Sequence, residues 1–450
     1  MKTKDNENTL FFYSLIILLA VYKFSFAGFL YTPYLDDYVQ YLYYPNFSEP
    51  FKNILFGGAG TAFTRPLAAL ADIYLWGKLF HFTGIVILLL SLIYAASGIF
   101  FYKTLKNLSI SAGPVFLIIY TLLPSFSEGT YWISAATRIV PGLFFTSVSL
   151  MFMARGKKIL FFIFSLLSHG FYEQISIISF LGAALIFLSA PKKYFKEFIL
   201  AAISLILIAS YYLLFGKMGD NSLRLGIDHE FYLNIGKNLS ALSKLFFTKQ
   251  LPLYTKGFIR GLDYIKSAGS WLWLFTLFII TYFLFSVYPK EKSYCFSKQK
   301  FIAGIILFIA PALPFFVLKD PWLNFRNVVP SALGFAIIAD EIFKVFKNKV
   351  KYIAAFLCIF LCICNVSEVM DYNKTAQNDL KIIKEIQDSY SGENTIYYEI
   401  TTPYYLTQNS PYHDHIMSIV GSDWGLTGSV RAYLKNRNIT VNIINSKQDI

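Results

Sequence analysis

Long apolar runs follow one another along the first 370 residues of the chain. Two of the clearest, GIVILLLSLIYAASGIFF (84–101) and FILAAISLILIASYYLLF (198–215), contain no charged residue. An α-helix of roughly 18 residues, at ~1.5 Å per residue, is sufficient to cross about 30 Å of hydrocarbon. One such run would also suit a buried helix of a soluble domain. A whole series of them predicts an all-α polytopic membrane protein.

The runs predict eleven transmembrane helices within a membrane domain over residues 1–370. We expect these helices at about 10–30, 82–102, 109–124, 139–154, 158–170, 172–190, 197–216, 271–288, 301–319, 328–345 and 351–369. The segments at 139–154 and 158–170 are short for full spans. One helix pair could therefore be re-entrant or thin the bilayer locally.

Two stretches between these runs are predicted to lie outside the membrane. In the first outside loop, 31–81, the segment 63–81 carries three charged residues, so we expect an interfacial helix with Trp76 and Phe80 facing lipid. Making this segment a span would invert every later loop against the charge pattern described below. The large outside loop, 217–270, is expected to be partly helical around 239–247.

The sequence becomes mainly polar after residue 370. The patterns predict a helix at 379–390, a strand at 395–400, a helix at 429–436 and a strand at 439–444. Residues 371–450 are therefore expected to form a small α/β domain outside the membrane.

Composition supports a membrane protein, since 56% of the residues are hydrophobic and only 15% are charged, against about 25% charged residues in soluble domains. The net charge of +13 could suggest nucleic acid in a soluble protein. Here it follows loop position, so no nucleic-acid partner is expected. The four cysteines show no paired spacing outside the membrane, which argues against a disulfide framework or a zinc site.

Loop charges predict one orientation. With the N-terminus inside, the inside loops hold sixteen cations: Lys103, Lys106, Arg155, Lys157, Lys158, Lys192, Lys193, Lys196, Lys290, Lys292, Lys298, Lys300, Lys344, Lys347, Lys349 and Lys351. Because cytoplasmic loops are enriched in Lys and Arg, we expect the N-terminus to be cytoplasmic and residues 371–450 to be outside. The expected location is the cytoplasmic (inner) membrane of a bacterium, with membrane lipids as partners.

Five stretches at helix ends gather on the predicted outer face. They are YLDDY (34–38), TAFTRPL (61–67), SEGTYWISAATR (127–138), SHGFYEQ (168–174) and LNFRN (323–327). Ionisable residues near the membrane often mark function. Each stretch alone suits an ordinary solvated loop charge, but five of them on one face indicate a shared site.

The residue types suggest a chemistry. A carboxylate at the boundary can take a proton from a hydroxyl, and a neighbouring acid raises the pKa of one member of the pair. Arginines offer planar forks for phosphate. Tyr38, Tyr131 and Trp132 suit the flat faces of sugars and are equally ordinary interfacial aromatics. The set suits a reaction between a lipid-phosphate-linked sugar and a hydroxyl acceptor.

These elements resemble the GT-C superfamily of polyprenyl-phosphate-sugar-dependent glycosyltransferases, in particular bacterial transferases of the O-antigen glucosyltransferase kind. The similar motifs are LDDY and R-P-L in the first loop, an E…YW element, an HG..EQ element and a late R…P element. In this sequence they comprise Asp36, Asp37, Arg65, Glu128, Tyr131, Trp132, His169, Gly170, Glu173, Gln174, Arg326 and Pro330.

The resemblance implies a GT-C-like fold and an inverting hexosyltransferase that acts on the extracytoplasmic face. Its donor would be a polyprenyl-phosphate-linked sugar, and its acceptor a glycan or lipid of the cell envelope. The catalytic base would be Asp36 or Asp37, with Asp36 slightly favoured. The expected phosphate ligands are Arg65, Arg138 and Arg326, and the expected sugar or acceptor ligands are Glu128, Tyr131, Trp132, His169 and Glu173.

No cofactor follows firmly from the resemblance, although the Asp-Asp pair could hold a divalent cation. Two other functions stay open. A flippase or exporter of lipid-linked glycans would need polar residues on both faces, whereas here they concentrate on one face. A polymerase or ligase of such glycans is compatible with Arg224, His229 and Arg260 in the large loop.

Overall fold

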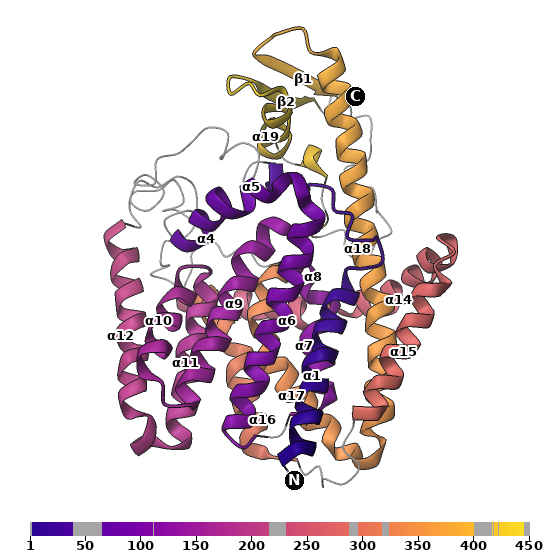
Figure 1. The fold of residues 1–450 in the computed structure, drawn as a ribbon. Coiled ribbons are helices and arrows are strands. Elements are labelled where there is room, and N and C mark those ends of the chain that lie inside the picture. The colour runs from indigo at the N-terminus through magenta and orange to yellow at the C-terminus, as the bar shows by residue number, and fades with distance from the viewer. Residues whose placement is uncertain are drawn as a thin grey trace.

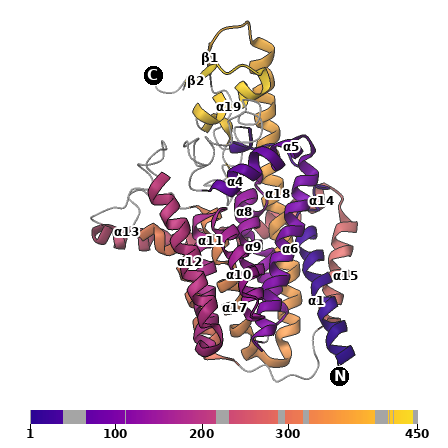
Figure 2. The ribbon, with the colours of Figure 1, turned by 60° about the vertical axis from the view of Figure 1, so that its left-hand side comes forward.

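The computed structural model describes residues 2–38, 65–110, 112–215, 231–287, 296–316, 324–399, 416, 418–421 and 423–444. Most of these residues form a bundle of roughly parallel helices, and a small group of elements from the C-terminal part covers one end (Figure 1). The N-terminus lies at the opposite end (Figures 1 and 2). We call the end near the C-terminal elements the site end.

Each predicted span coincides with a helix. The helices are α1 (Lys2–Lys23), α6 (Thr83–Asn107), α7 (Pro114–Leu122), α9 (Ile133–Ala154), α10 (Lys158–His169), α11 (Glu173–Ser189), α12 (Pro191–Phe215), α15 (Trp271–Val287), α16 (Lys298–Ile309), α17 (Ala332–Phe343) and α18 (Val350–Ser389). Proline starts α7 and α12, where its missing N–H costs no hydrogen bond.

Length and composition support an all-α membrane protein. Five helical stretches are long and apolar enough to cross a membrane: Pro66–Asn107, Ile133–Ala154, Pro191–Leu214, Lys298–Phe316 and Val350–Ser389. Other apolar helices, such as α10 and α11, are shorter. The number of eleven spans and the orientation therefore stay predictions.

The helix after the last apolar run is not a separate element. Helix α18 continues for 40 residues from Val350 to Ser389, so the helix predicted at 379–390 is present as the last part of α18. The segment contains no glycine or proline, and a change from apolar to polar side chains alters the surroundings of a helix without breaking its backbone. At ~1.5 Å per residue, α18 leaves the bundle and reaches the C-terminal elements (Figure 1).

The segment predicted to be interfacial is helical from Pro66 to Phe82, but its aromatic side chains face differently from the prediction. It comprises α4 (Pro66–Ala71), the π-helical turn η3 (Asp72–Trp76), α5 (Gly77–Leu79) and η4 (Phe80–Phe82). Trp76 and Phe80 are buried, whereas Tyr74 and Phe82 are exposed. A π turn holds an extra residue, which rotates the following side chains away from the positions that a regular helix predicts.

Short helices complete the bundle. They are η5 (Pro124–Phe126), α8 (Ser127–Thr130), α13 (Phe231–Ser243), the π turn η8 (Lys244–Thr248), α14 (Leu251–Ser267), η9 (Ala310–Phe316), η10 (Phe325–Ser331) and η11 (Lys344–Lys349). The helix expected around 239–247 is thus present as α13 and η8. Helix α14 packs closely on α18 because Gly261 brings its backbone against the carbonyl of Ile363.

The C-terminal elements contain the two predicted strands. Strands β1 (Thr395–Glu399) and β2 (Thr440–Ile444) pair in parallel, with Thr395 opposite Thr440. Around them lie η12 (Ile419–Gly421) and α19 (Asp423–Leu434), which corresponds to the helix expected at 429–436. Residue 400, the predicted end of the first strand, is outside the described residues. The apolar side chains of β1, β2, η12 and α19 are part of the same hydrophobic core as those of α18. A separate C-terminal domain therefore stays a prediction.

Candidate functional site

Asp37 organises the turn that follows α1. Its carboxylate is fully buried and accepts hydrogen bonds from the Tyr31 hydroxyl at 2.5 Å, the Tyr34 N–H at 2.9 Å and the Ser134 N–H at 2.9 Å. This turn lies outside the spanning helices. Burial raises the pKa of Asp37 to about 7, although the three hydrogen bonds oppose the rise. Asp37 therefore shapes the turn instead of facing outward.

The start of α9 holds the same turn from the other side. The indole N–H of Trp132 donates to the carbonyl of Tyr34 at 3.2 Å. The backbone N–H of Ile133 donates to the Tyr31 hydroxyl at 3.1 Å. Together with the Asp37–Ser134 bond, these contacts fix the position of residue 36 relative to α9.

Asp36 lies among positive charges. It is half-buried, and the charged groups that act on it are the guanidinium groups of Arg326 and Arg138. Burial raises the pKa of Asp36 above its ordinary value, and the two guanidinium groups oppose that rise. Of the two adjacent acids, Asp36 is thus the one on which the charges of these arginines act.

Arg138 and Arg326 reach this cluster from distant parts of the chain. Arg138 projects from α9, with its Nε 3.5 Å from Oδ2 of Asp72 in η3. The guanidinium carbon of Arg326, in η10, lies 5.5 Å from the centre of the Trp132 ring. The backbone N–H of Arg326 donates to Oε2 of Glu128 at 3.2 Å. The buried Glu128 therefore holds the turn that presents Arg326.

Arg65 and Glu173 form a second ion pair at the site end. Nε of Arg65 is 3.0 Å from both carboxylate oxygens of Glu173. The guanidinium carbon lies 4.5 Å from the centre of the Tyr172 ring. Tyr172 also interacts electrostatically with Arg326 and Glu128, so this pair borders the Asp36 cluster.

His169 is placed differently from the other site candidates. It is fully buried, and its Nε2 lies 3.2 Å from the Ser204 hydroxyl of α12 and 3.4 Å from the Ser165 hydroxyl of α10. These contacts join two helices inside the bundle. They do not include Asp36 or the arginines.

The aromatic candidates are mostly buried. The Tyr131 ring stacks on Phe24 at 5.2 Å, and its hydroxyl donates to Oδ1 of Asn373 at 3.3 Å. Trp132 is only 4% exposed, so its ring contacts the Arg326 guanidinium group inside the protein. The Tyr38 ring lies 5.9 Å from the Tyr433 ring of α19, which links the Asp36 turn to the C-terminal elements.

The sequence reasoning missed the contribution of α18. The Tyr372 ring lies 5.3 Å from the Tyr34 ring, and Tyr372 interacts electrostatically with Glu128 and Arg326. Deeper in the bundle, Glu368 interacts with the buried Lys23. A signal was available: residues 365, 368 and 372 are polar at helical spacing within or beside an apolar run, which places them on one helix face.

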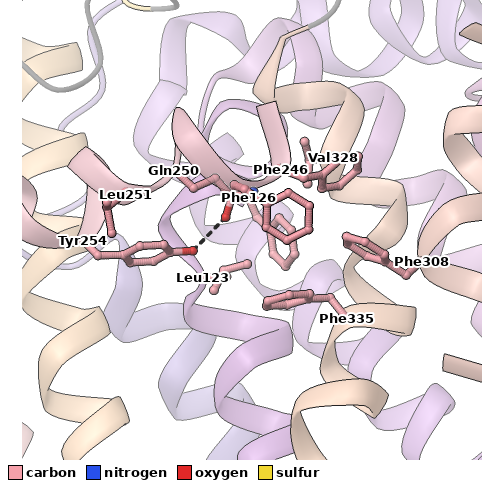
Figure 3. Close-up of a pocket in the computed structure, with 10 residues that line it drawn as sticks. Leu123, Phe126, Phe246, Gln250, Leu251, Tyr254, Phe308, Val328 and Phe335 are labelled. Atoms are coloured by element: carbon pink, nitrogen blue, oxygen red, sulfur yellow. Dashed lines mark hydrogen bonds between the residues drawn. The ribbon is translucent and has the colours of Figure 1, made fainter. Parts of the chain in front are cut away.

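An apolar cavity of about 250 Å³ lies between the segment η8–α14 and parts of the bundle that include η5 and η10 (Figure 3). Its lining consists of Leu123, Phe126, Phe246, Phe247, Gln250, Leu251, Tyr254, Phe308, Val328 and Phe335. The Tyr254 hydroxyl donates to the Gln250 side chain at 2.9 Å. Two lining residues are close in sequence to polar residues of the site: Phe126 is two residues before Glu128, and Val328 is two residues after Arg326. The cavity is therefore next to the cluster and offers a chemically opposite surface.

Metal binding finds little support in the described residues. Within them, no group of three or more His, Cys, Asp or Glu residues could hold a metal ion. Both oxygens of Asp37 already accept protein hydrogen bonds. Two of these bonds are to Oδ2 and one is to Oδ1, which leaves one lone-pair position of the carboxylate unused by them.

Comparison of the chain with models of protein families, with curated proteins and with solved structures finds no match. Functional argument therefore depends on the geometry of the site.

Proposed function

We propose that this protein is an inverting GT-C-type glycosyltransferase that moves a sugar from a polyprenyl-phosphate donor to a hydroxyl of an envelope glycan or lipid. The observation that carries the proposal is the electrostatic interaction of Asp36 with Arg138 and Arg326 at the site end of an apolar helix bundle. A base beside two phosphate-binding groups suits a reaction in which a proton leaves and a phosphate departs.

The reaction balances with these groups. The acceptor oxygen forms a bond to the anomeric carbon, and the bond from that carbon to the carrier phosphate breaks. Asp36 takes the proton of the acceptor hydroxyl. The polyprenyl phosphate leaves with the electron pair, and Arg138 and Arg326 stabilise its charge. Attack from the face opposite the phosphate inverts the configuration at the anomeric carbon.

The neighbouring cavity would receive part of the carrier chain. Its lining is apolar apart from Gln250 and Tyr254, which bond to each other. A volume of about 250 Å³ is below the roughly 300–1,000 Å³ of drug-sized ligand sites, so it suits a few carbons of a hydrocarbon chain. Its position beside Arg326 would place the phosphate at the guanidinium groups.

A binding measurement tests the donor class without knowledge of the sugar. Undecaprenyl phosphate, used as a representative polyprenyl-phosphate leaving group, is titrated into the full purified chain and its Kd is measured. We expect R326Q to weaken binding by at least tenfold, since a charge-assisted phosphate contact contributes about 1.5–3 kcal/mol. K381Q, on the exposed distal part of α18, is the matched control. Equal affinity of R326Q and wild type would contradict the proposed role of Arg326.

A further inference from the structure

The connection between α12 and α15 is unusually basic. Residues 231–267 contain Lys237, Lys244, Lys249, Lys256, Arg260 and Lys266 but only one acid, Asp263. Arg260 forms an ion pair with the buried Asp371 of α18. The five lysines are exposed. This concentration of positive charge has no role in the proposed reaction.

Large apolar side chains are exposed on the same helices. They are Ile235, Leu239, Phe247, Leu251, Ile259 and Leu262, and Phe247 is 69% exposed. On α14 these residues lie opposite the face that packs on α18, which consists of Leu253, Gly257, Gly261 and Ile265. The outward face therefore combines exposed lysines with exposed apolar groups.

The position of this segment explains the combination. Helix α12 ends at Phe215 and α15 begins at Trp271, both at the site end. Helix α13 projects sideways from the bundle (Figure 2). Trp271 is 63% exposed, as expected for an aromatic residue at the membrane–water boundary. If α12 and α15 cross the bilayer as predicted, residues 231–267 lie near its surface at the site end.

We propose that α13, η8 and α14 form a binding surface for anionic phospholipids. The apolar side chains would insert among the acyl chains, and the lysines would contact the phosphate headgroups. Zwitterionic lipids would leave five lysines without a matching net charge. A soluble polyanion would leave the apolar side chains exposed to water. Anionic lipid satisfies both parts of the surface.

This surface also forms one wall of the cavity. Five residues of η8, α14 or the two-residue link between them line the cavity: Phe246, Phe247, Gln250, Leu251 and Tyr254. Lipid bound at the neighbouring lysines would hold this wall against the bundle. The inference does not depend on the proposed reaction, because it concerns the attachment of the segment to the membrane.

The test compares two sets of three lysines in the full purified chain. K244Q/K249Q/K256Q removes three charges from the surface beside Phe247 and Leu251. K381Q/K384Q/K435Q removes three exposed lysines of the C-terminal elements and serves as the control. Each protein in neutral detergent is titrated with dioleoylphosphatidylglycerol or dioleoylphosphatidylcholine, and the shift in Tm gives an apparent affinity.

We expect the anionic lipid to stabilise the wild-type protein and the control more than the zwitterionic lipid does. The apparent affinity of K244Q/K249Q/K256Q for the anionic lipid should fall on the order of 100-fold, since each lysine contributes about fivefold. Unchanged affinity in this variant would overturn the proposal. So would equal stabilisation by both lipids, or the same stabilisation by heparin, which would indicate a soluble polyanion site. Gel filtration before each titration shows that the variants are folded.

Discussion

The backbone N–H of Ser134 donates a hydrogen bond to Oδ1 of Asp37 at 2.9 Å. This bond joins the turn after α1 to the start of α9, although the two residues are 97 positions apart. It gives adjacent acids different roles. Asp37 is held by protein donors, whereas Asp36 interacts electrostatically with Arg138 and Arg326.

Asp37 should make stability depend on pH. Its pKa rises from 3.8 to about 7 on folding, so the protonated form is favoured in the folded state. Its contribution to stability is complete below the unfolded pKa and is lost as pH rises through about 7. We expect Tm to fall between pH 5 and 8 by an amount that D37N removes. A parallel decline in D37N and wild type would show that other groups cause it.

D37N should also destabilise the turn at a fixed low pH. Asparagine presents one acceptor oxygen where aspartate uses two, so at least one of the three donors loses its partner. The expected cost is about 1–3 kcal/mol in the free energy of unfolding, measured by denaturant titration at pH 5. Y31F removes the Tyr31 donor and also the acceptor of the Ile133 N–H, so it should destabilise the same turn. A D37N protein as stable as wild type would contradict the role of Asp37 in the turn.

Arg326 should set the acid side of the pH–rate profile. Its guanidinium group lowers the pKa of Asp36 against the effect of burial. Replacing it in R326Q should raise the pKa of Asp36, so the rate should begin to fall at a higher pH than in wild type. Residual transfer is measured against pH, with R65Q as the comparison because Arg65 is not among the charges that act on Asp36. A shift toward lower pH in R326Q would be the wrong sign for this account.

The Arg65–Glu173 pair should couple α4 to α11. Both side chains are partly buried, at 21% and 28% exposure, and Nε contacts both carboxylate oxygens. A double-mutant cycle of R65Q, E173Q and the double variant should give a coupling energy of about 1 kcal/mol in the free energy of unfolding. Additive effects of the two substitutions would mean that the pair contributes nothing to stability.

Two helical glycines offer a matched test of the α14–α18 contact. A Cβ at Gly261 would overlap the backbone carbonyl of Ile363, whereas a Cβ at Gly236 of α13 would meet nothing within 4 Å. G261A should lower the free energy of unfolding by about 1–3 kcal/mol. G236A should leave it unchanged or raise it by up to about 1 kcal/mol, since alanine favours helix. Equal stability of the two variants would argue against close packing at Gly261.

Apolar periodicity predicted the positions of the bundle helices, because a run such as 84–101 is helical in any membrane arrangement. It failed where backbone geometry changed locally. The π turn at Asp72–Trp76 rotated Trp76 into the core, and nothing in the hydrophobic pattern of 63–81 marks that turn. Nor does the pattern show that the last predicted span and the helix predicted at 379–390 belong to one continuous helix, Val350–Ser389.

The argument from helix ends on one face of the bundle selected Asp36, Arg138 and Arg326 as candidates, and their electrostatic interaction is compatible with it; a shared functional site stays a prediction. Its internal arrangement could not follow from that argument. The sequence LDD gives no sign of which carboxylate Ser134 binds, since the partner lies 97 residues away. Likewise His169 stands beside Gly170 in a motif-like stretch, yet its side chain bonds to Ser204 within the bundle.

The most direct test measures transfer of a labelled sugar by wild type, D36N and D37N in proteoliposomes. A panel of polyprenyl-phosphate-linked hexoses is supplied with an extract of envelope glycolipids, and released polyprenyl phosphate is quantified together with labelled product. We expect D36N to lower transfer at least 100-fold, the typical contribution of a general base, with its Tm unchanged. D37N should lose stability and keep measurable transfer. Full transfer by D36N, or loss of transfer confined to D37N, would contradict the assignment of Asp36 as the base.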